Sequence, residues 1–561
     1  MRKGYFIGHM KYLSFTHRHS YLGAAIASIL LALTTIGFAP GLLGILPLAY
    51  FIKLNVASTN KIHSFKLGFL FGIGYFLICY WPVSTAGNWT GWALVSNDAN
   101  TSINTGAGSK GEAALSIDAF LIITLIVMSV CSAVLSAIVC LFSKFVLMRK
   151  GRTCFYIAFV VAWLLVAESV RSWVLLDGYH FINLGRALVD FPIIRLNASL
   201  GGINLLSGIF IILSVVLVEI WLVRAINKTV ITLSALLILS FSYGSIHHLN
   251  LEKEEGILVP VSAVQTSIAQ SFGDTAVRKD FNAHWLSKRY LNSLKAELNY
   301  QKSSQLTQII ALPESIGFGT MSIDGSLSKR SSIRTLSDIA QWDASIVPLF
   351  SEQQTIVVLG SDTTEKQQDF NSLVVWDSHG RVSRYHKRKL VPFAEYTPNF
   401  IKSLSAFEER IGYSRGSGHQ VRSFNAFKLA FLICQETLFP NLVRDTITEG
   451  KANLIIVSGN DGVFESKSVS YINHQNAQIR AIENGRAVVR AMKNGISSII
   501  LANGKVLDKV AVNKEGTARG MVKMRNHTTL YARYPYLTEL FALLVFISLV
   551  ALCLVRRQQS I

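Results

Sequence analysis

Charged residues are scarce in this sequence. Asp, Glu, Lys and Arg make up 16% of the 561 residues, whereas half of the residues are hydrophobic. Typical soluble domains carry about 25% charged residues, so the deficit argues against a chain that is soluble throughout and favours a membrane protein. The formal net charge of +20 would suggest a nucleic-acid partner in a soluble chain. The Arg/Lys runs lack interleaved aromatic residues, however, and give no support for nucleic acid.

Motifs for metals, phosphates and disulfides are also missing. The 13 histidines are scattered, and there is no HExxH, no CxxC and no Gly-rich phosphate loop, so we expect neither a metal nor a cofactor. Of the six cysteines, Cys434 alone lies in the long polar region from about residue 250 to 534. That region therefore has no internal partner for a disulfide, and its thiol is free or bonded to something else.

Long apolar runs are plentiful, and several approach the roughly 20 residues needed to cross a bilayer. The break at Ala39-Pro40-Gly41 does not resemble a small-residue cleavage site, and further runs follow at once, so we expect the first run to be a retained span. The sequence predicts a polytopic α-helical membrane bundle of about eight spans. They are 21–38, 42–52, 67–83, 117–147, 154–175, 203–223, 230–245 and 537–555.

The basic residues between these runs predict an orientation. Loops on the cytoplasmic side of a membrane carry an excess of Lys and Arg, and an N-terminus in the cytoplasm makes the short inside loops agree with this rule. Both termini are then cytoplasmic, and the polar region faces the opposite side. We expect a membrane bundle over 1–250, a separate polar domain over 251–533, and a last span with a basic tail over 534–561. The basic residues of the inside loops and tail are Lys53, Lys61, Lys66, Lys144, Arg149, Lys150, Arg152, Arg224, Lys228, Arg556 and Arg557.

The polar region alternates apolar strands with longer helix-like stretches, which predicts one α/β domain. Pro260 lies inside the first strand and indicates an edge or irregular strand, because proline cannot donate to a sheet. The predicted strands include 257–261, 308–312, 355–359, 429–433 and 453–457, and the stretch 371–380 is predicted to be a strand and a turn. The predicted helices are 277–300 and 470–490.

Reactive groups follow three of these segments. Glu314 follows the strand at 308–312, Lys387 lies in a basic run after the strand and turn at 371–380, and Cys434 ends the strand at 429–433. A thiol needs a base to become a thiolate, and a carboxylate such as Glu314 can take its proton. A tetrahedral oxyanion needs fixed positive charge, which Lys387 and the backbone N–H after the nucleophile would supply.

Simpler interpretations of the same residues stay open at this point. Free cysteine is among the most buried residue types, so Cys434 alone fits a small core residue. Glu314 alone fits a solvated loop acid, and Arg388 with Lys389 fits a patch for lipid headgroups.

The order of these groups resembles the nitrilase, or carbon–nitrogen hydrolase, superfamily, and more narrowly the apolipoprotein N-acyltransferases. The eight-span layout, with the polar domain between the last two spans, also fits that family. The stretches that carry the resemblance are LPES at Glu314, RYHKRKLVPFAEYTP at Lys387, LICQE at Cys434, Gly37-Phe38-Ala39-Pro40, Ala263-Val264-Gln265, and Arg480 to Arg486 with Asn494-Gly495 behind it.

The resemblance implies a four-layer αββα sandwich joined to the membrane bundle, in a bacterial inner membrane with the catalytic domain on the periplasmic side. It implies a ping-pong transfer of a fatty acyl chain, from a phospholipid donor through a Cys434 thioester to the amino group of a diacylated prolipoprotein, among membrane lipids. The residues implied are Glu314 as base, Lys387 as oxyanion stabiliser, Cys434 as nucleophile, Glu395 and Glu436 as supporting acids, and Gln435, Phe393, Asn460 and Val463 at substrate-binding positions.

The sequence departs from this family at several aromatic positions. Gln435 stands where an aromatic residue usually follows the cysteine, and Val463 stands where the family's Asn-Asp-Ala-Trp-Phe loop has tryptophan. Ser271 to Asp274 replaces an expected tryptophan, and Asp177 to His180 replaces Phe-Pro-Trp. Two alternatives therefore stay open: a membrane-tethered amidase that uses water, and a divergent acyltransferase with another amine acceptor. The intact set of Glu314, Lys387 and Cys434 argues against a non-catalytic scaffold.

Overall fold

The computed structural model describes residues 17–84, 117–175, 177–224, 226–254, 256–267, 292–298, 307–314, 320–322, 354–377, 382–392, 395–396, 412–418, 421–424, 427–464 and 466–555. These residues form two compact units. The membrane unit comprises the described parts of Met1–Pro82, Ile123–Glu252 and Thr529–Ile561. The sheet unit comprises the described parts of Val83–Ile122 and Lys253–Thr528.

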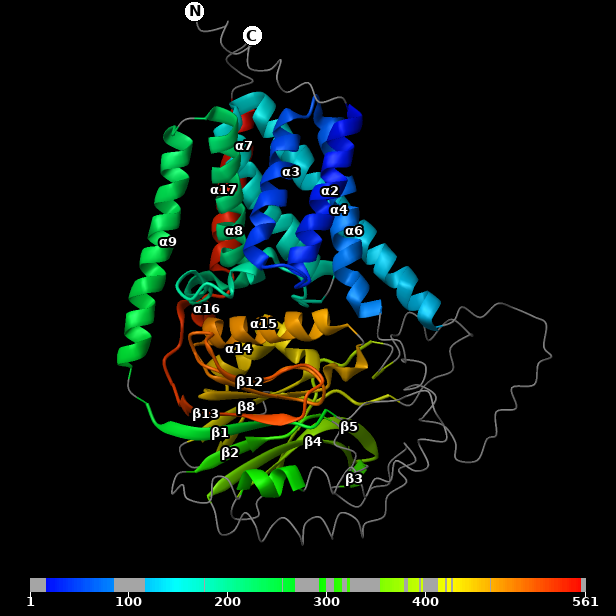
Figure 1. Cartoon of the computed structure of the whole chain (residues 1–561), viewed down its shortest axis with the longest axis vertical. Helices are drawn as coiled ribbons and strands as arrows, with labels where there is room; N and C mark the ends of the chain where they lie inside the picture. The colour runs from blue at the N-terminus through cyan, green and yellow to red at the C-terminus, as the bar shows by residue number, and fades with distance from the viewer. Residues whose placement is uncertain are drawn as a thin grey trace, which may run out of the picture. The chain divides into compact units, whose positions relative to one another are not determined.

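Each of the predicted apolar runs is helical in the membrane unit (Figure 1). Helix α7 continues as a π-helical segment η3, and 3-10 turns η2, η4 and η5 lie between the longer helices. The helices are α2 His17–Thr35, η2 Gly41–Gly44, α3 Ile45–Ala57, α4 Lys61–Ser84, α6 Ile117–Lys150, α7 Arg152–Ala162, η3 Trp163–Leu175, η4 Leu184–Leu188, η5 Ile194–Asn197, α8 Ala198–Val223, α9 Lys228–Lys253, α16 Leu530–Arg533 and α17 Leu537–Val555.

Six helices in the described part of the chain are long and apolar enough to cross a membrane, fewer than the roughly eight spans predicted. Helix α2 falls short because it opens on His17, Arg18 and His19, which lower its hydropathy. The Gly41–Ala57 segment is apolar but shorter. The six are Lys61–Ser84, Ile122–Lys150, Arg152–Val174, Ile194–Val223, Lys228–Lys253 and Leu537–Leu554.

Small residues allow α4 and α6 to pack closely. A Cβ atom at Gly68 would lie 2.8 Å from Cα of Ala137, and one at Gly72 would lie 2.7 Å from Cα of Ala133. Glycine and alanine four residues apart on facing helices are the pattern by which membrane helices bring their backbones together. The small residues at these positions therefore let α4 and α6 pack as a close helix pair.

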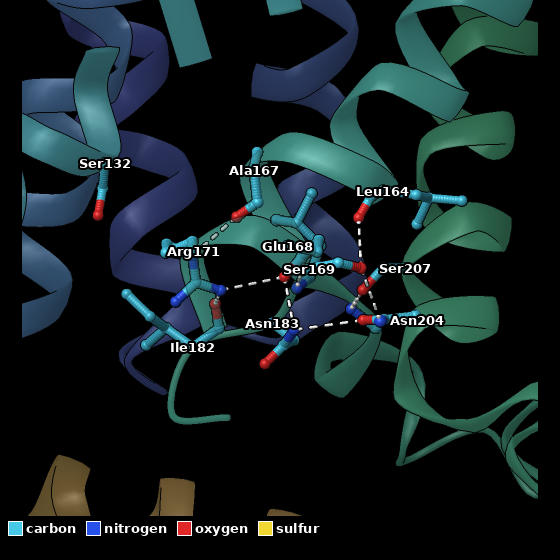
Figure 2. A network of polar contacts seen from close by, with 12 residues as sticks. Ser132, Leu164, Ala167, Glu168, Ser169, Arg171, Ile182, Asn183, Asn204 and Ser207 are labelled. Carbon is cyan, nitrogen blue, oxygen red and sulfur yellow. Dashed lines mark hydrogen bonds and ion pairs between the residues drawn. The ribbon is translucent and has the colours of Figure 1, made fainter. Parts of the chain in front are cut away.

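A buried polar network holds the segment between η3 and α8 in the membrane unit (Figure 2). The Glu168 carboxylate accepts hydrogen bonds from Arg171 Nη2 at 3.1 Å, Asn183 Nδ2 at 2.6 Å and the Leu184 backbone N–H at 2.9 Å. Asn204 Nδ2 in turn donates to Glu539 of α17 at 2.7 Å. Charged groups within a bundle are costly unless paired, and this pairing folds residues 177–197 into the unit.

The sheet unit contains two β-sheets. The first has the order β13-β1-β2-β4-β5-β6 with β3 paired to β4, and the second has the order β12-β11-β10-β9-β8-β7. The strands of the first are β1 Leu258–Gln265, β2 Gln308–Ala311, β3 Thr320–Ser322, β4 Thr355–Glu365, β5 Gln368–Trp376, β6 Val382–His386 and β13 Gly516–Lys523. Those of the second are β7 Arg422–Phe424, β8 Phe427–Ile433, β9 Leu454–Gly459, β10 Val488–Met492, β11 Ser497–Ile500 and β12 Val506–Val510.

The two sheets pack face to face, with helices on their outer faces. Alternate residues of both sheets, such as Val261 and Val358 from the first and Phe431 and Ile456 from the second, form one buried cluster. Helices α14 Pro440–Thr448 and α15 Lys467–Asn484 cover the second sheet (Figure 1). Residues 292–298 form a helix whose Glu297 accepts a hydrogen bond from Ser262 of β1. The predicted αββα arrangement is confirmed.

Two local predictions need correction. The helix expected over 470–490 ends at Asn484, because Gly485 adopts φ +62° as its C-cap, and the β-branched Val488 and Val489 then start β10. Of the two alternatives for the strand that holds Pro260, an edge strand is wrong, since β13 and β2 flank β1. Pro260 is accommodated because pairing with β2 begins only at Val261, which leaves β13 as the sole neighbour there. Most of the helix expected over 277–300 lies outside the described residues.

Candidate active site

Glu314, Lys387 and Cys434 come together at the ends of three strands. Glu314 lies just after β2, Lys387 directly after β6, and Cys434 directly after β8. The Lys387 ammonium Nζ lies 3.5 Å from Glu314 Oε1. Glu314 and Lys387 both act electrostatically on the Cys434 thiol. The three residues that were predicted at strand ends therefore lie in one cluster.

Two further side chains, the Glu395 carboxylate and the neutral Asn371 amide, complete the cluster. Lys387 Nζ donates to Glu395 Oε1 at 2.9 Å. Asn371 of β5 donates through Nδ2 to Glu314 Oε1 at 2.7 Å and to Glu395 Oε1 at 2.8 Å. Because a carboxylate only accepts hydrogen bonds, these two contacts fix the orientation of the Asn371 amide. The two carboxylates thus share one cation and one amide donor.

Lys387 is held as a permanent cation. Its side chain is 1% exposed, and burial by itself would lower its pKa. Glu395, Glu314 and Cys434 more than offset this and raise the pKa of Lys387 above its ordinary value. A buried ammonium that keeps its charge is a preorganised partner for negative charge that develops beside it.

Cys434 occupies a strained turn. Its φ of +53° lies in the left-handed region, which costs a non-glycine residue about 1–3 kcal/mol and is concentrated at functional sites. Gly459 at the end of β9 leaves room for this turn, since a Cβ atom there would lie 3.1 Å from Cα of Cys434 and 2.6 Å from Cε of Met492. The sequence alone gave no sign of this geometry.

The Cys434 thiol needs a base in order to react. Burial raises its pKa above the ordinary value, and Glu314 raises it further, whereas Lys387 and a backbone hydrogen bond from Asn460 lower it. Burial also raises the pKa of Glu314, against the lowering effect of Lys387. The resting site therefore holds a protonated thiol beside a carboxylate of increased proton affinity, which is the arrangement needed for proton transfer during attack.

Glu436 joins the cysteine turn to the segment that carries Lys387. It is fully buried and accepts hydrogen bonds from Tyr385 Oη at 2.7 Å, from the backbone N–H groups of Arg388 and Lys389 at 2.7 and 3.0 Å, and from that of Ile433 at 2.8 Å. Burial raises its pKa and these donors partly offset that effect. Glu436 thus contacts the backbone beside Lys387, whereas Glu395 contacts the ammonium.

The turn after β9 is fixed by a second buried ion pair. Asp461 pairs with Arg490 of β10 at 2.9 Å and accepts from Asn473 of α15 at 2.9 Å. Glycine is required opposite, because a Cβ atom at Gly495 would lie 2.3 Å from Asp461 Oδ2. Since the Asn460 N–H faces the Cys434 sulfur, this ion pair supports the wall beside the thiol.

Comparison with known proteins finds similar chains. The carbon–nitrogen hydrolase family model matches residues 287–528. Apolipoprotein N-acyltransferase from Rickettsia bellii is 26% identical over 543 residues, covering 93% of this chain and 95% of the relative. Residues 287–528 are thus similar to the carbon–nitrogen hydrolases. The predicted resemblance to the apolipoprotein N-acyltransferases of that superfamily is confirmed.

Other relatives show how far the likeness extends. The apolipoprotein N-acyltransferase of Rickettsia prowazekii is 24% identical, covering 72% of this chain and 77% of its own. Among solved structures, a carbon–nitrogen hydrolase superfamily protein from Xanthomonas campestris matches 50% of this chain and 96% of its own at 17% identity and a TM-score of 0.32. The likeness to the Rickettsia bellii relative, at 93% of this chain, thus extends beyond the residues that the family model matches.

The four residues expected at substrate-binding positions fall in different places. Gln435 and Val463 are partly exposed in short 3-10 turns, η6 Cys434–Leu438 and η7 Asp461–Val463. Asn460 is buried, and its side chain accepts from the Gly462 N–H at 3.0 Å to cap η7. Phe393 lies outside the described residues. Gln435 and Val463 are thus the two of these residues with exposed surface, and Gln435 directly follows Cys434 in the chain.

Asn371 provides a first test of the cluster. Replacing it by leucine removes the amide that donates to Glu314, so the pKa of Glu314 rises. A hydrogen bond to a charged group is worth about 1.5–3 kcal/mol, so we expect kcat/KM at neutral pH to fall at least about tenfold, with its acid limb moved to higher pH. The measurement is the pH dependence of acyl transfer.

The matched control is Ser372→Ala. Ser372 is the next residue of β5 and its side chain contacts Thr363 and His386 instead, so this variant should keep the wild-type acid limb. An Asn371→Leu profile that overlaid the wild-type one would mean that the amide has no influence on Glu314.

Proposed function

We propose that this enzyme transfers a fatty acyl chain from a phospholipid to the N-terminal amino group of a diacylglyceryl-cysteine lipoprotein, through a thioester on Cys434. Its similarity to an apolipoprotein N-acyltransferase over 93% of its length supports the assignment as a membrane acyltransferase. The observation that carries the proposed mechanism is the cluster in which Lys387 lies 3.5 Å from Glu314 and both act on Cys434.

In the first half-reaction Cys434 attacks the ester carbonyl of the phospholipid. Glu314 takes the thiol proton as the carbon–sulfur bond forms, and the carbonyl electron pair moves onto oxygen. The Lys387 ammonium and the Gln435 backbone N–H stabilise that oxyanion. When it collapses, the lysophospholipid oxygen leaves and takes the proton back from Glu314, which leaves the acyl group on sulfur as a thioester.

In the second half-reaction the lipoprotein amine attacks this thioester in its neutral form. Glu314 takes the proton that the amine loses as the amide bond forms, and Lys387 again stabilises the oxyanion. The Cys434 thiolate leaves and recovers a proton from Glu314. The two half-reactions together move one acyl group and consume no net proton, so the chain's own residues suffice.

The membrane unit has a physical role in this scheme, because both substrates carry acyl chains. Bringing such a chain into water costs about 0.8 kcal/mol for each exposed CH₂ group, so substrates that stay in the bilayer avoid the cost. The similarity to bacterial apolipoprotein N-acyltransferases supports a location in a bacterial inner membrane. The Lys and Arg distribution supports an orientation with both termini in the cytoplasm and a catalytic domain over 251–533 on the periplasmic side.

The test is acylation of the purified full chain with a phospholipid of defined acyl chains. Intact-mass and peptide mass spectrometry should find one acyl group on the peptide that contains Cys434, removable by hydroxylamine as expected for a thioester. Cys434→Ala should abolish the adduct, whereas Cys553→Ala, which removes a buried thiol of α17, should keep it.

Adding a diacylated lipopeptide then identifies the acceptor. An amide-linked third acyl chain on the peptide is the expected product. Free fatty acid as the sole product would replace the proposal with a water-using amidase-type hydrolase. No adduct, under conditions in which a known acyltransferase of this family becomes acylated, would overturn the thioester mechanism itself.

A further inference from the structure

A second lysine lies beside the catalytic cluster. Lys493 directly follows β10, and its side chain is 6% exposed. Strand β10 runs parallel to β9, and Met492 is opposite Gly459 in their register. Because parallel strands present their carboxyl ends at the same edge of a sheet, Lys493 emerges at the edge where β8 delivers Cys434.

Backbone contacts fix the position of this lysine. The Lys493 N–H donates to the Gly459 carbonyl at 3.0 Å, and the Lys493 carbonyl accepts from the Ser267 N–H at 2.9 Å. Gly459 is the residue whose Cβ would lie 3.1 Å from Cα of Cys434. Gly459 therefore lies between the Lys493 backbone and Cys434, and hydrogen bonds to Gly459 and Ser267 fix that backbone.

Charge explains why a lysine is tolerated at this depth. Burying an ammonium is unfavourable unless an opposite charge faces it. Burial lowers the pKa of Lys493 to about 8, and the Glu314 carboxylate acts in the opposite direction. Lys493 is therefore mainly protonated at neutral pH, and the Glu314 carboxylate favours its charged form.

We propose that Lys493 is a positioning residue of the catalytic cluster, a second cation that keeps Glu314 ionised so that it can accept the Cys434 proton. This inference rests on the proposed role of Glu314 as the base.

The charges of the cluster make the role specific. Glu314 is faced by Lys387, Glu395, Cys434 and Lys493. Glu395 favours protonation of Glu314 and is itself bonded to Lys387 at 2.9 Å, closer than Glu314 at 3.5 Å. Lys387 is thus shared between two carboxylates and bound more closely to Glu395. A second cation brings the charges of the two carboxylates and two lysines into balance.

The experiment compares Lys493→Met with wild type in the full-length detergent-purified enzyme, using the pH dependence of Cys434 acylation by phospholipid. Loss of the cation raises the pKa of Glu314, so the acid limb should move to higher pH. A shift of about one pH unit corresponds to a roughly tenfold lower rate below the wild-type pKa, with recovery at alkaline pH. Lys493→Arg keeps the charge and should keep the wild-type limb. Lys505→Met, at an exposed lysine, is the matched control.

Alkylation of Cys434 by iodoacetamide is the second readout, because it reports thiolate formation without any acyl substrate. It should show the same acid-limb shift in Lys493→Met, and the thermal midpoint establishes that the variant is folded. A uniform loss at every pH, or an unshifted limb, would overturn the role of Lys493. Failure of the proposed function is distinguishable from this, because wild-type enzyme would then form no acyl adduct while alkylation still reports on Lys493.

Discussion

Replacing Glu314 by glutamine is expected to lower the rate of acyl transfer by about 10²–10⁴-fold, the usual contribution of a positioned general base. Glutamine keeps the size of the side chain and can still accept from Asn371, which donates to Glu314 at 2.7 Å. It cannot accept the Cys434 proton. Since burial raises the pKa of that thiol, little thiolate forms without the base. Single-turnover acylation of Cys434 is the direct measurement.

The matched control is Glu395→Gln, which removes a carboxylate from the other side of the same lysine. Glu395 raises the pKa of Glu314, so its removal should move the acid limb to lower pH, whereas Glu314→Gln should abolish that limb. An activity of Glu314→Gln within about tenfold of wild type would mean that another group takes the proton, because the loss of a general base costs about 10²-fold or more.

The three reactive groups were predictable because each follows an apolar run. Strands of buried residues are visible in sequence, and the groups that end them gather at one edge of an α/β fold, as Glu314, Lys387 and Cys434 do. The family resemblance added Glu395 and Glu436. How Glu436 acts was not predictable, since its bonds to the Arg388 and Lys389 backbone depend on the turn that follows Cys434.

Asn371 and Lys493 were missed for two different physical reasons. Asn371 lies inside a strand and reaches Glu314 because the β5–β6 register, with Ser372 opposite His386, brings it beside Lys387. That register is not encoded in either strand alone. Lys493 was hidden because the predicted helix ran through Arg490. Once Gly485 is recognised as the helix end, Val488 to Met492 reads as a strand and Lys493 becomes a strand-end group like the others.

Replacing Lys387 by methionine is expected to impair both catalysis and folding. Removing one oxyanion donor typically costs about 10²–10³ in rate. The variant also leaves Glu314 and Glu395 buried on the same Asn371 amide without the Lys387 cation that they share. Breaking a buried pair in this way costs about 3–5 kcal/mol. Thermal unfolding and single-turnover acylation measure the two effects separately.

The loss of stability should depend on pH with a definite sign. Lys387 lowers the pKa of Glu314, so without it the folded-state pKa of this carboxyl rises further above the unfolded value. The folded variant then binds more protons than the unfolded chain, and its stability increases as pH falls through that raised pKa.

The double variant Lys387→Met/Glu395→Gln removes the surplus negative charge, so it should recover much of the stability at neutral pH while transfer stays slow. A single variant as stable as wild type at neutral pH would contradict the ion-pair account, and a double variant with restored transfer would contradict the role of Lys387 in stabilising the oxyanion.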